Sequence, residues 1–326
     1  MRIAILGAGA WGSALSISFA ERHPVTLWAR DAHDCARLER ERVSAYLPEC
    51  ALPSGIRVEP ELATAVKQAE LAIIATATAG LRSVAQALAA CGSRTPVLWA
   101  CKGFEQQTRR LPHEIVAESL PGLREAGALS GPSFALEVAR GQPTALVLAS
   151  EDSGFAAATA AALNSPRLRL YSSRDVRGVE LGGAVKNVIA IAAGISDGLE
   201  LGRNARAALI TRGLAEMVRL GVALGGQAET FMGLAGLGDL VLTCTGDLSR
   251  NREVGVQLAQ GRTLAQILGE LGHVAEGVRS AEAVREMSAR HAIEMPITEA
   301  VCAVLSGGAT PGEAVSRLLT RDPRAE

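Results

Sequence analysis

The 326-residue sequence predicts an α/β fold in its first part and an all-helical fold in its second part. In the first part, short apolar runs alternate with longer amphipathic segments, which is typical of a mainly parallel sheet covered by helices on both faces. After Tyr171 the strand-like runs nearly vanish, and from Gly178 onward the apolar residues follow a helical period. We therefore expect two domains, residues 1–175 and residues 176–326.

The expected strands of the first domain are short and apolar. They are Ile3–Leu6, Val25–Trp28, Leu71–Ala75, Val97–Ala100 and Ala145–Ala149. We expect one helix at Ala14–Glu21, directly after the first strand. A second helix is indicated by four apolar residues at helical spacing, namely Leu81, Val84, Ala85 and Leu88.

The composition argues against several classes of protein. A net charge of -1 and an aromatic content of 3% do not favour a nucleic-acid partner. The six cysteines form no C-x-x-C pair and have no histidine at metal-ligand spacing, so we expect reduced thiols and no metal site. Gly7 and Gly9 interrupt the first apolar run, unlike a signal peptide, and no uncharged apolar run is long enough to span a bilayer. We expect a cytoplasmic protein without stable membrane insertion, whose oligomeric state is open and includes a homodimer as one option.

The segment Gly7-Ala-Gly-Ala-Trp-Gly12 has the G-x-G-x-x-G pattern, follows an expected strand and opens an expected helix. Gly7 would allow a tight turn, Gly9 would let the backbone approach a diphosphate, and Gly12 would let helix and strand pack closely. The helix N-terminus adds N–H groups and a positive dipole end. We favour a Rossmann-type dinucleotide site over the alternative, a plain strand-to-helix turn that needs glycine.

Arg30 and Asp31 follow the second strand, where an acidic residue commonly binds the ribose of NAD and an arginine accommodates the 2′-phosphate of NADP. Because Arg30 lies nearer the strand, the sequence favours NADP, or use of both cofactors. A solvated Arg–Asp pair is the alternative. Trp11 would either cover the nucleotide or pack on the domain.

Ligands of open parallel sheets bind beyond the carboxyl ends of the strands, where this sequence places Gly7, Arg30, Thr76, Lys102 and Gly131. Lys102 would therefore emerge at the mouth of the crevice, unless it is an ordinary surface lysine. The turn-rich segment Ser130–Ser133 offers N–H groups and hydroxyls that suit a phosphate or a carbonyl oxygen.

The second domain contains one isolated lysine, Lys186, within a long apolar stretch. Burial would lower its pKa and suit it to act as an acid or base, with Asn187 as an orienting neighbour. The alternative is a lysine that reaches out of a helix face to solvent. Ser249, Arg250 and Asn251 combine a hydroxyl, a guanidinium and an amide near a helix start, which suits a phosphate, although a helix cap with exposed arginines would look the same.

Together these pieces resemble the bacterial-type NAD(P)-dependent glycerol-3-phosphate dehydrogenases over nearly the whole chain. The pieces are Gly7–Gly12, Ala100–Gly103, Ser130–Ala135, Glu180–Asn187, Asn204–Gly213, Leu234–Asp239, Ser249–Asn251 and Val274–Gly277. The resemblance implies a Rossmann domain, a helical domain, and the interconversion of dihydroxyacetone phosphate and sn-glycerol 3-phosphate. It further implies that the reaction mainly runs toward reduction and supplies phospholipid synthesis.

The resemblance also assigns roles to individual residues. Lys186 is expected to exchange the proton, with Lys102 and Asp239 as further catalytic residues. The substrate-binding residues are expected to be Lys102, Gly131, Ser133, Lys186, Asp239, Ser249, Arg250 and Asn251. The cofactor-binding residues are expected to be Gly7, Gly9, Trp11, Gly12, Arg30, Lys102, Ala135, Arg250, Val274 and Glu276, with NADPH favoured over NADH.

One segment departs from the family pattern: Thr76-Ala-Thr78 stands where many members have a Val-Pro-Ser-like piece, which affects the expected shape of the loop on the nicotinamide side. Because neither half carries a complete set of parts, we expect the active site between the domains. Two other functions remain open. One is a dehydrogenase for a hydroxy acid or a ketopantoate-like substrate, which would lack the Ser249-Arg-Asn251 anchor. The other is a non-catalytic dinucleotide sensor, which would not need Lys186 or Asp239.

Overall fold

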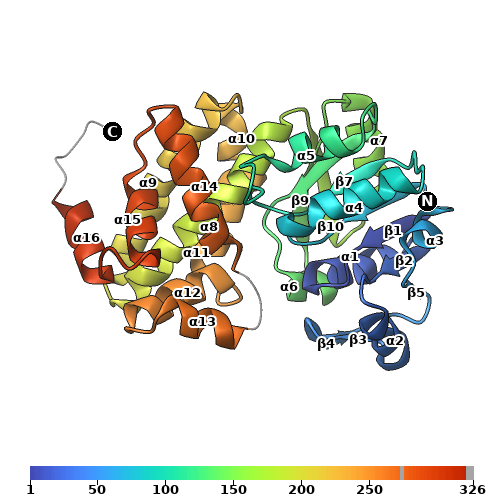
Figure 1. Ribbon diagram of the computed structural model, residues 1–326, viewed down its shortest axis with the longest axis horizontal. Helices are drawn as coiled ribbons and strands as arrows, with labels where there is room; N and C mark the ends of the chain where they lie inside the picture. The colour runs from blue at the N-terminus through green and yellow to red at the C-terminus, as the bar shows by residue number, and fades with distance from the viewer. Residues whose placement is uncertain (272–274, 321–326) are drawn as a thin grey trace. The chain divides into compact units, whose positions relative to one another are not determined.

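The structure, a computed structural model, describes residues 1–271 and 275–320. It divides into two compact units, Met1–Glu180 and Leu181–Glu326, and each is described by itself below (Figure 1). The division falls within one long helix, α8 (Val176–Gly198), which contributes residues to both units. The boundary after residue 175 that the sequence suggests remains a prediction.

The first unit is built on an eight-stranded sheet in the order β10-β9-β8-β7-β6-β1-β2-β5. The strands are β1 (Ile3–Leu6), β2 (Val25–Trp28), β5 (Arg57–Glu59), β6 (Leu71–Ile74), β7 (Val97–Trp99), β8 (Ala126–Ser130), β9 (Thr144–Ala149) and β10 (Leu168–Ser173). All neighbours are parallel except β8 and β9. Because β1 pairs with β2 on one side and β6 on the other, the strand order reverses between β1 and β6, which is where open sheets of this kind bind ligands.

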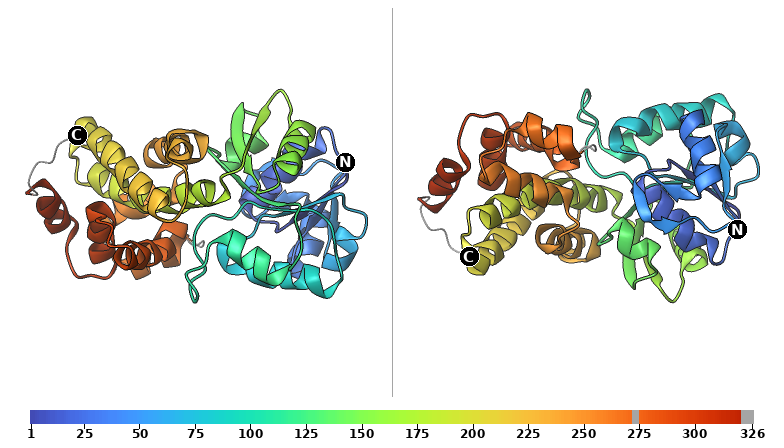
Figure 2. Two further views of the ribbon diagram at one scale, coloured as in Figure 1. Left: turned by 90° about the horizontal axis from the view of Figure 1, so that it is seen from above. Right: turned by 90° about the horizontal axis from the view of Figure 1, so that it is seen from below.

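Helices lie on both faces of this sheet (Figure 2). They are α1 (Ala10–Ala20), α2 (Ala32–Glu41), α3 (Leu62–Val66), α4 (Thr78–Ala90), α5 (Pro112–Ser119), α6 (Ala135–Ala139) and α7 (Ser153–Leu163). A small hairpin, β3 (Val43–Ser44) and β4 (Leu47–Ala51), lies between α2 and β5 in the sequence. The central strands read as continuous apolar runs because both faces are covered: Ile3, Ile5, Leu71 and Ile73 are at most 1% exposed.

The predicted α/β fold with a helical second part is confirmed, and β1 and β2 have the predicted bounds. Helix α1 begins at Ala10 rather than Ala14, because the glycine turn itself opens the helix. Three strands of this sheet, β5, β8 and β10, are not among the strands predicted from the sequence. Strand β8 consists mostly of small residues, Ala-Gly-Ala-Leu-Ser, and β10 is an edge strand that alternates buried and exposed side chains, so neither forms a continuous apolar run.

Every regular element within residues 181–271 and 275–320 is helical. After α8 come α9 (Gly202–Ala223), α10 (Ala228–Met232), a π-helical turn (Leu234–Gly238) and α11 (Asp239–Thr245), followed by α12 (Arg250–Ala259), α13 (Leu264–Leu271), α14 (Glu276–Arg290), α15 (Pro296–Leu305) and α16 (Pro311–Leu319). Helix α8 is long and apolar enough to cross a membrane by length and composition alone, but its most apolar window is entirely buried inside the protein, as in the core helix of a soluble protein.

The start of α8 is fixed to the first unit by a buried carboxyl group. Glu180 accepts hydrogen bonds from Nε1 of Trp99 (2.7 Å) and from the backbone N–H of His113 (2.8 Å), and its second oxygen lies 2.6 Å from Nδ1 of His113. Burial raises the pKa of Glu180. Burial lowers the pKa of His113, but the hydrogen bond and charge of Glu180 oppose this, and the net result is a raised pKa. The first turns of α8 are thereby anchored to the end of β7 and to α5.

Candidate active site

The glycine turn after β1 has the geometry that a dinucleotide diphosphate requires. Gly7 has a φ of +126°, which only glycine adopts readily. A Cβ placed on Gly12 would overlap the carbonyl oxygen of Gly7, so α1 can pack this closely only without a side chain there. A Cβ on Gly9, in contrast, would meet nothing within 4 Å, which leaves open space at the N-terminus of α1. The turn therefore fits the phosphates of the predicted cofactor.

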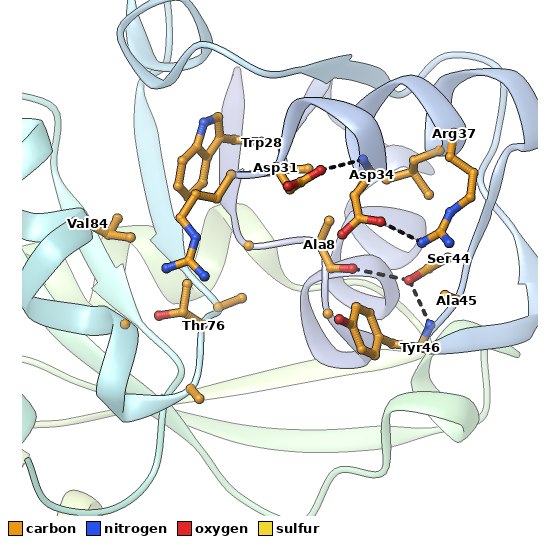
Figure 3. A pocket seen from close by; sticks show the side chains of 18 of the residues that line it. Ala8, Trp28, Asp31, Asp34, Arg37, Ser44, Ala45, Tyr46, Thr76 and Val84 are labelled. Atoms are coloured by element: carbon orange, nitrogen blue, oxygen red, sulfur yellow. Dashed lines mark hydrogen bonds and ion pairs between the residues drawn. The ribbon is translucent and has the colours of Figure 1, made fainter. Parts of the chain in front are cut away.

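A cavity of about 490 Å³ lies beside this turn, within the first unit (Figure 3). Its lining includes Gly7, Gly9, Arg30 and Thr76, so the structure brings four of the predicted residues together. The volume lies in the usual range for a small-molecule or cofactor site.

Asp31 also lines this cavity, but its carboxylate has a structural role. It accepts a hydrogen bond from the backbone N–H of Asp34 (2.9 Å) and so caps α2. This hydrogen bond lowers the pKa of Asp31. Arg37 brings a second guanidinium to the cavity and is paired with Asp34 (2.8 Å), so Arg30 is not the only arginine there.

Arg37 and the β3–β4 hairpin are parts of this cavity that the sequence did not predict. Ser44 donates a hydrogen bond to the carbonyl oxygen of Ala8 (3.2 Å) and so attaches the hairpin to the glycine turn. Tyr46 presents an aromatic ring to the same cavity (Figure 3). The hairpin residues match no motif. The only available signal for Arg37 is its helical spacing from Asp34, which predicts a surface ion pair equally well.

Trp11 and Ala135 pack against one small apolar cluster that includes Ala14, Leu47 and Val138. Neither residue is among those that line the cavity beside the glycine turn. The indole Nε1 of Trp11 is buried and has no hydrogen-bond partner in the described part of the chain. Packing on the domain is therefore observed for Trp11, while its role toward the cofactor remains a prediction.

At the carboxyl edge of the sheet, Lys102 lies beyond β7 and Gly131 beyond β8, as predicted. The Nζ atom of Lys102 donates a hydrogen bond to the carbonyl oxygen of Gly131 (3.0 Å), and Oγ of Ser133 donates to the same oxygen (3.0 Å). All three residues therefore meet at one point, and the side chain of Lys102 lies along the edge rather than extending into solvent.

In the second unit, Lys186 is buried in α8 with 7% of the residue exposed, which rules out the solvent-reaching alternative. Its Nζ atom donates hydrogen bonds to Oδ1 of Asp239 (2.5 Å) and to Oγ1 of Thr243 (2.9 Å). Asp239 is 1% exposed, so the two charges balance each other away from bulk solvent. Thr243, one turn further along α11, is a partner that the sequence analysis missed, because its role depends on the packing of α11 against α8.

Close backbone packing places Asp239 there. A Cβ on Gly182 of α8 would lie 2.5 Å from the carbonyl oxygen of Ala235, which belongs to the π-helical turn before α11. The glycines of the Glu180–Asn187 and Leu234–Asp239 segments therefore allow two backbones to approach, and the lysine and the aspartate extend from the joined elements.

The Ser249-Arg-Asn251 segment has two kinds of side chain. Ser249 caps α12 by accepting a hydrogen bond from the backbone N–H of Arg252 (3.3 Å), and Arg250 is exposed. Asn251 is buried: it donates to Oδ1 of Asn187 (2.9 Å) and accepts from the backbone N–H of Gly277 (2.9 Å). Asn187 therefore forms a hydrogen bond with Asn251. The segment combines both features that the sequence allowed: Ser249 caps the helix, and Arg250 presents an exposed guanidinium that suits a phosphate.

Two predicted cofactor residues remain. Glu276 is the first residue of α14, next to Gly277. Val274 lies outside the described residues.

A glycine turn at the reversal point of a parallel sheet, a lysine at the sheet edge and a buried lysine–aspartate pair are parts of a dinucleotide-dependent oxidoreductase. The comparisons with known proteins agree with this class. The family model for the N-terminus of NAD-dependent glycerol-3-phosphate dehydrogenase matches residues 2–156, and the model for the C-terminus of that enzyme matches residues 175–316.

The chain is 57% identical to a glycerol-3-phosphate dehydrogenase [NAD(P)+] of Thiobacillus denitrificans and 55% identical to that of Nitrosospira multiformis, over 100% of this chain and at least 99% of each relative. A crystal structure of glycerol-3-phosphate dehydrogenase from Coxiella burnetii matches with a TM-score of 0.93 and 41% identity, and covers 98% of this chain and 99% of that chain. The chain belongs to the glycerol-3-phosphate dehydrogenase family. A ketopantoate reductase family structure from Ralstonia eutropha shares the fold alone, with a TM-score of 0.62 and 16% identity.

Proposed function

We infer that the protein is an NAD(P)-dependent glycerol-3-phosphate dehydrogenase that interconverts dihydroxyacetone phosphate and sn-glycerol 3-phosphate. The observation that carries this function is the buried Lys186–Asp239 pair in a chain of this family. When bound, the nicotinamide ring supplies or accepts a hydride at the secondary carbon of the substrate. The protein supplies position, charge and a proton.

In the proposed reaction, Lys186 gives its Nζ proton to the carbonyl oxygen as that oxygen gains negative charge, and takes it back in the reverse direction. Asp239 holds the ammonium group by charge and Thr243 fixes its direction. A donor that is already oriented needs little reorganisation during the reaction, so these partners contribute to the rate through Lys186.

Lys102, Gly131 and Ser133 are proposed to contact the same substrate. Their shared hydrogen bonds hold a cationic group and a hydroxyl at the carboxyl edge of the sheet, beyond β7 and β8, while the glycine turn follows β1 on the other side of β6. A cation there suits a ligand that carries phosphate.

Arg250 is proposed to hold the substrate phosphate, with Ser249 and Asn251 in support. Its guanidinium is exposed at the first turn of α12, where the helix dipole also favours an anion. Asn251 already bonds to Asn187 and Gly277, so it would act mainly by keeping this turn in place.

NADPH is the proposed preferred cofactor, because Arg30 and Arg37 both line the cavity and the carboxylate of Asp31 is engaged in capping α2. We further propose a cytoplasmic enzyme, with a homodimer as one option, that supplies glycerol phosphate for phospholipid synthesis.

The phosphate assignment is tested with two substrates, dihydroxyacetone phosphate and dihydroxyacetone. Arg250→Ala should lower kcat/KM for the phosphorylated substrate about 10-fold or more, because a charge-assisted contact contributes roughly 1.5–3 kcal/mol. Because Arg250 is also an expected cofactor-binding residue, the rates are measured with saturating NADPH, and the much weaker use of dihydroxyacetone should then hardly change. Arg203→Ala, at another exposed arginine of the helical unit, is a suitable control. Equal losses on both substrates would show that Arg250 does not read the phosphate and would favour the hydroxy-acid alternative.

A further inference from the structure

The hydroxyl group of Thr76 lies beside the glycine turn and has no role in the function proposed above. Oγ1 of Thr76 is buried and has no hydrogen-bond partner in the described part of the chain. A buried hydroxyl without a partner loses its hydrogen bonds with water and gains none in return, so its presence at this position needs an explanation. Thr76 is also the first residue of the segment that departs from the Val-Pro-Ser-like pattern, and valine has nearly the same shape as threonine without the hydroxyl.

The position of Thr76 points toward the cofactor. It follows β6, and β6 pairs with β1 at the place where the strand order reverses. Thr76 lines the same cavity as Gly7 and Gly9, and Figure 3 shows its side chain among the residues around that space. Its methyl carbon, Cγ2, would lie 3.1 Å from a Cβ placed on Gly7, so the side chain touches the turn that fits the diphosphate.

The hydroxyl itself lies 3.2 Å from a Cβ placed on Gly80 in the first turn of α4, nearer to this helix than the methyl carbon, which lies 3.6 Å from the same point. Rotation about χ1 from one staggered position to another can place Oγ1 where Cγ2 now lies, next to the glycine turn, while the methyl moves to the position of the Cβ hydrogen. The first turn of α4 adds the positive end of a 13-residue helix, and Ala77 before it has no side chain that could cap the helix.

We propose that Thr76 is a cofactor ligand whose hydroxyl donates a hydrogen bond to the diphosphate of the bound dinucleotide. In the free protein the hydroxyl is buried without a partner, and binding of the cofactor supplies one. The inference rests on the proposed function only in assuming that a dinucleotide binds beside the glycine turn. The inference predicts that the Thr76 hydroxyl has two opposite effects. It lowers the stability of the free protein, and it raises the affinity of the protein for the cofactor.

The test compares Thr76→Val with a matched control, Thr78→Val. Thr78 is two residues away, is 3% exposed and also has a buried Oγ1 without a partner in the described residues, but it is not among the residues that line the cavity. Both variants should unfold at the same temperature as the wild type or higher, because each removes a buried hydroxyl without a partner. NADPH binding, followed by fluorescence titration, should weaken about tenfold in Thr76→Val alone. Thr76→Ser, which keeps the hydroxyl, should remain within about twofold of the wild type.

Two cofactor fragments distinguish the diphosphate from other groups. Binding of ADP, which contains a diphosphate, should weaken in Thr76→Val by about the same factor as binding of NADPH. Binding of 2′-AMP, which lacks a diphosphate, should not change. Unchanged NADPH affinity in Thr76→Val, equal losses in both valine variants, or a loss seen with 2′-AMP would each overturn the inference. A wild-type protein that binds neither NADPH nor NADH would overturn the proposed function as well, so the two failures are distinguishable.

Discussion

Lys186 is the residue at which sequence and structure agree most directly. Its isolation in an apolar stretch predicts burial, and the structure places it with 7% of its surface exposed. The family resemblance proposes Asp239 and Lys102 as groups that hold Lys186, but no pattern in the sequence shows Thr243, which lies 57 residues away and meets the lysine only through the packing of α8 and α11. Residue type and local pattern therefore identify a candidate, while its partners require the fold.

Replacing this lysine should affect turnover and stability together. Lys186→Ala should reduce turnover by about 10²–10⁴ or more, because the proposed proton donor is lost. It should also lower the free energy of unfolding by about 3–5 kcal/mol, because Asp239 remains buried without its partner. NADPH affinity, measured by fluorescence titration, should stay close to wild type, since the glycine turn belongs to the first unit. Wild-type turnover in the folded variant would refute the role of Lys186.

The choice of cofactor is also decided at the scale of single residues. Arg30→Ala should shift the ratio of kcat/KM values from NADPH toward NADH by roughly 10- to 100-fold, the usual range for a charge-assisted contact to phosphate. Arg37→Ala should shift the ratio less, because the guanidinium of Arg37 is already paired with Asp34. The ratio is obtained from initial rates with each cofactor. If it stays the same in Arg30→Ala, Arg30 lies outside the 2′-phosphate site.

At the scale of elements, periodicity and turn chemistry predicted the strands that are continuously apolar and the helices that alternate with them. They could not identify β8, with its small residues, or the edge strand β10. The sequence pattern also cannot predict a helix cap when the capping side chain comes from a distant helix. Glu216 of α9 accepts hydrogen bonds from the backbone N–H groups of Ile297 (2.6 Å) and Thr298 (3.2 Å), and so caps the start of α15 in place of a local residue.

This distant cap makes a prediction about pH. Burial raises the pKa of Glu216 to about 7, although its hydrogen bonds with Ile297 and Thr298 oppose the rise. The folded state therefore holds a proton that the unfolded state releases near its ordinary pKa of 4.5. The contribution of Glu216 to the free energy of unfolding is therefore greatest below pH 4.5. This contribution, on the order of 3 kcal/mol, is lost as the pH rises to about 7.

Glu216→Gln should remove this dependence while keeping an oxygen that can accept from the helix. Denaturant unfolding at about pH 5 and about pH 8 gives the comparison: the wild type should lose more stability between the two conditions than the variant. The difference between the two proteins isolates Glu216 from other groups, such as Glu180 and His113, whose pKa values are also shifted. An identical pH dependence in both proteins would show that Glu216 keeps its ordinary pKa.

At the scale of the whole molecule, the sequence predicted a dinucleotide-binding unit followed by a helical unit, and the fold and the family both confirm it. The cofactor turn and Lys102 belong to the first unit, and Lys186, Asp239 and Arg250 belong to the second. The proposed reaction needs groups from both units, so the function is a property of the complete chain.

The central claim, that this chain reduces dihydroxyacetone phosphate, is tested most directly by one measurement. Purified wild-type protein is mixed with NADPH, and in parallel with NADH, and oxidation of the cofactor is followed on addition of dihydroxyacetone phosphate. We predict rapid oxidation that depends on this substrate and yields sn-glycerol 3-phosphate in equal amount to the cofactor consumed. Cofactor that binds without being oxidised by dihydroxyacetone phosphate, or is oxidised only by a keto acid, would contradict the account.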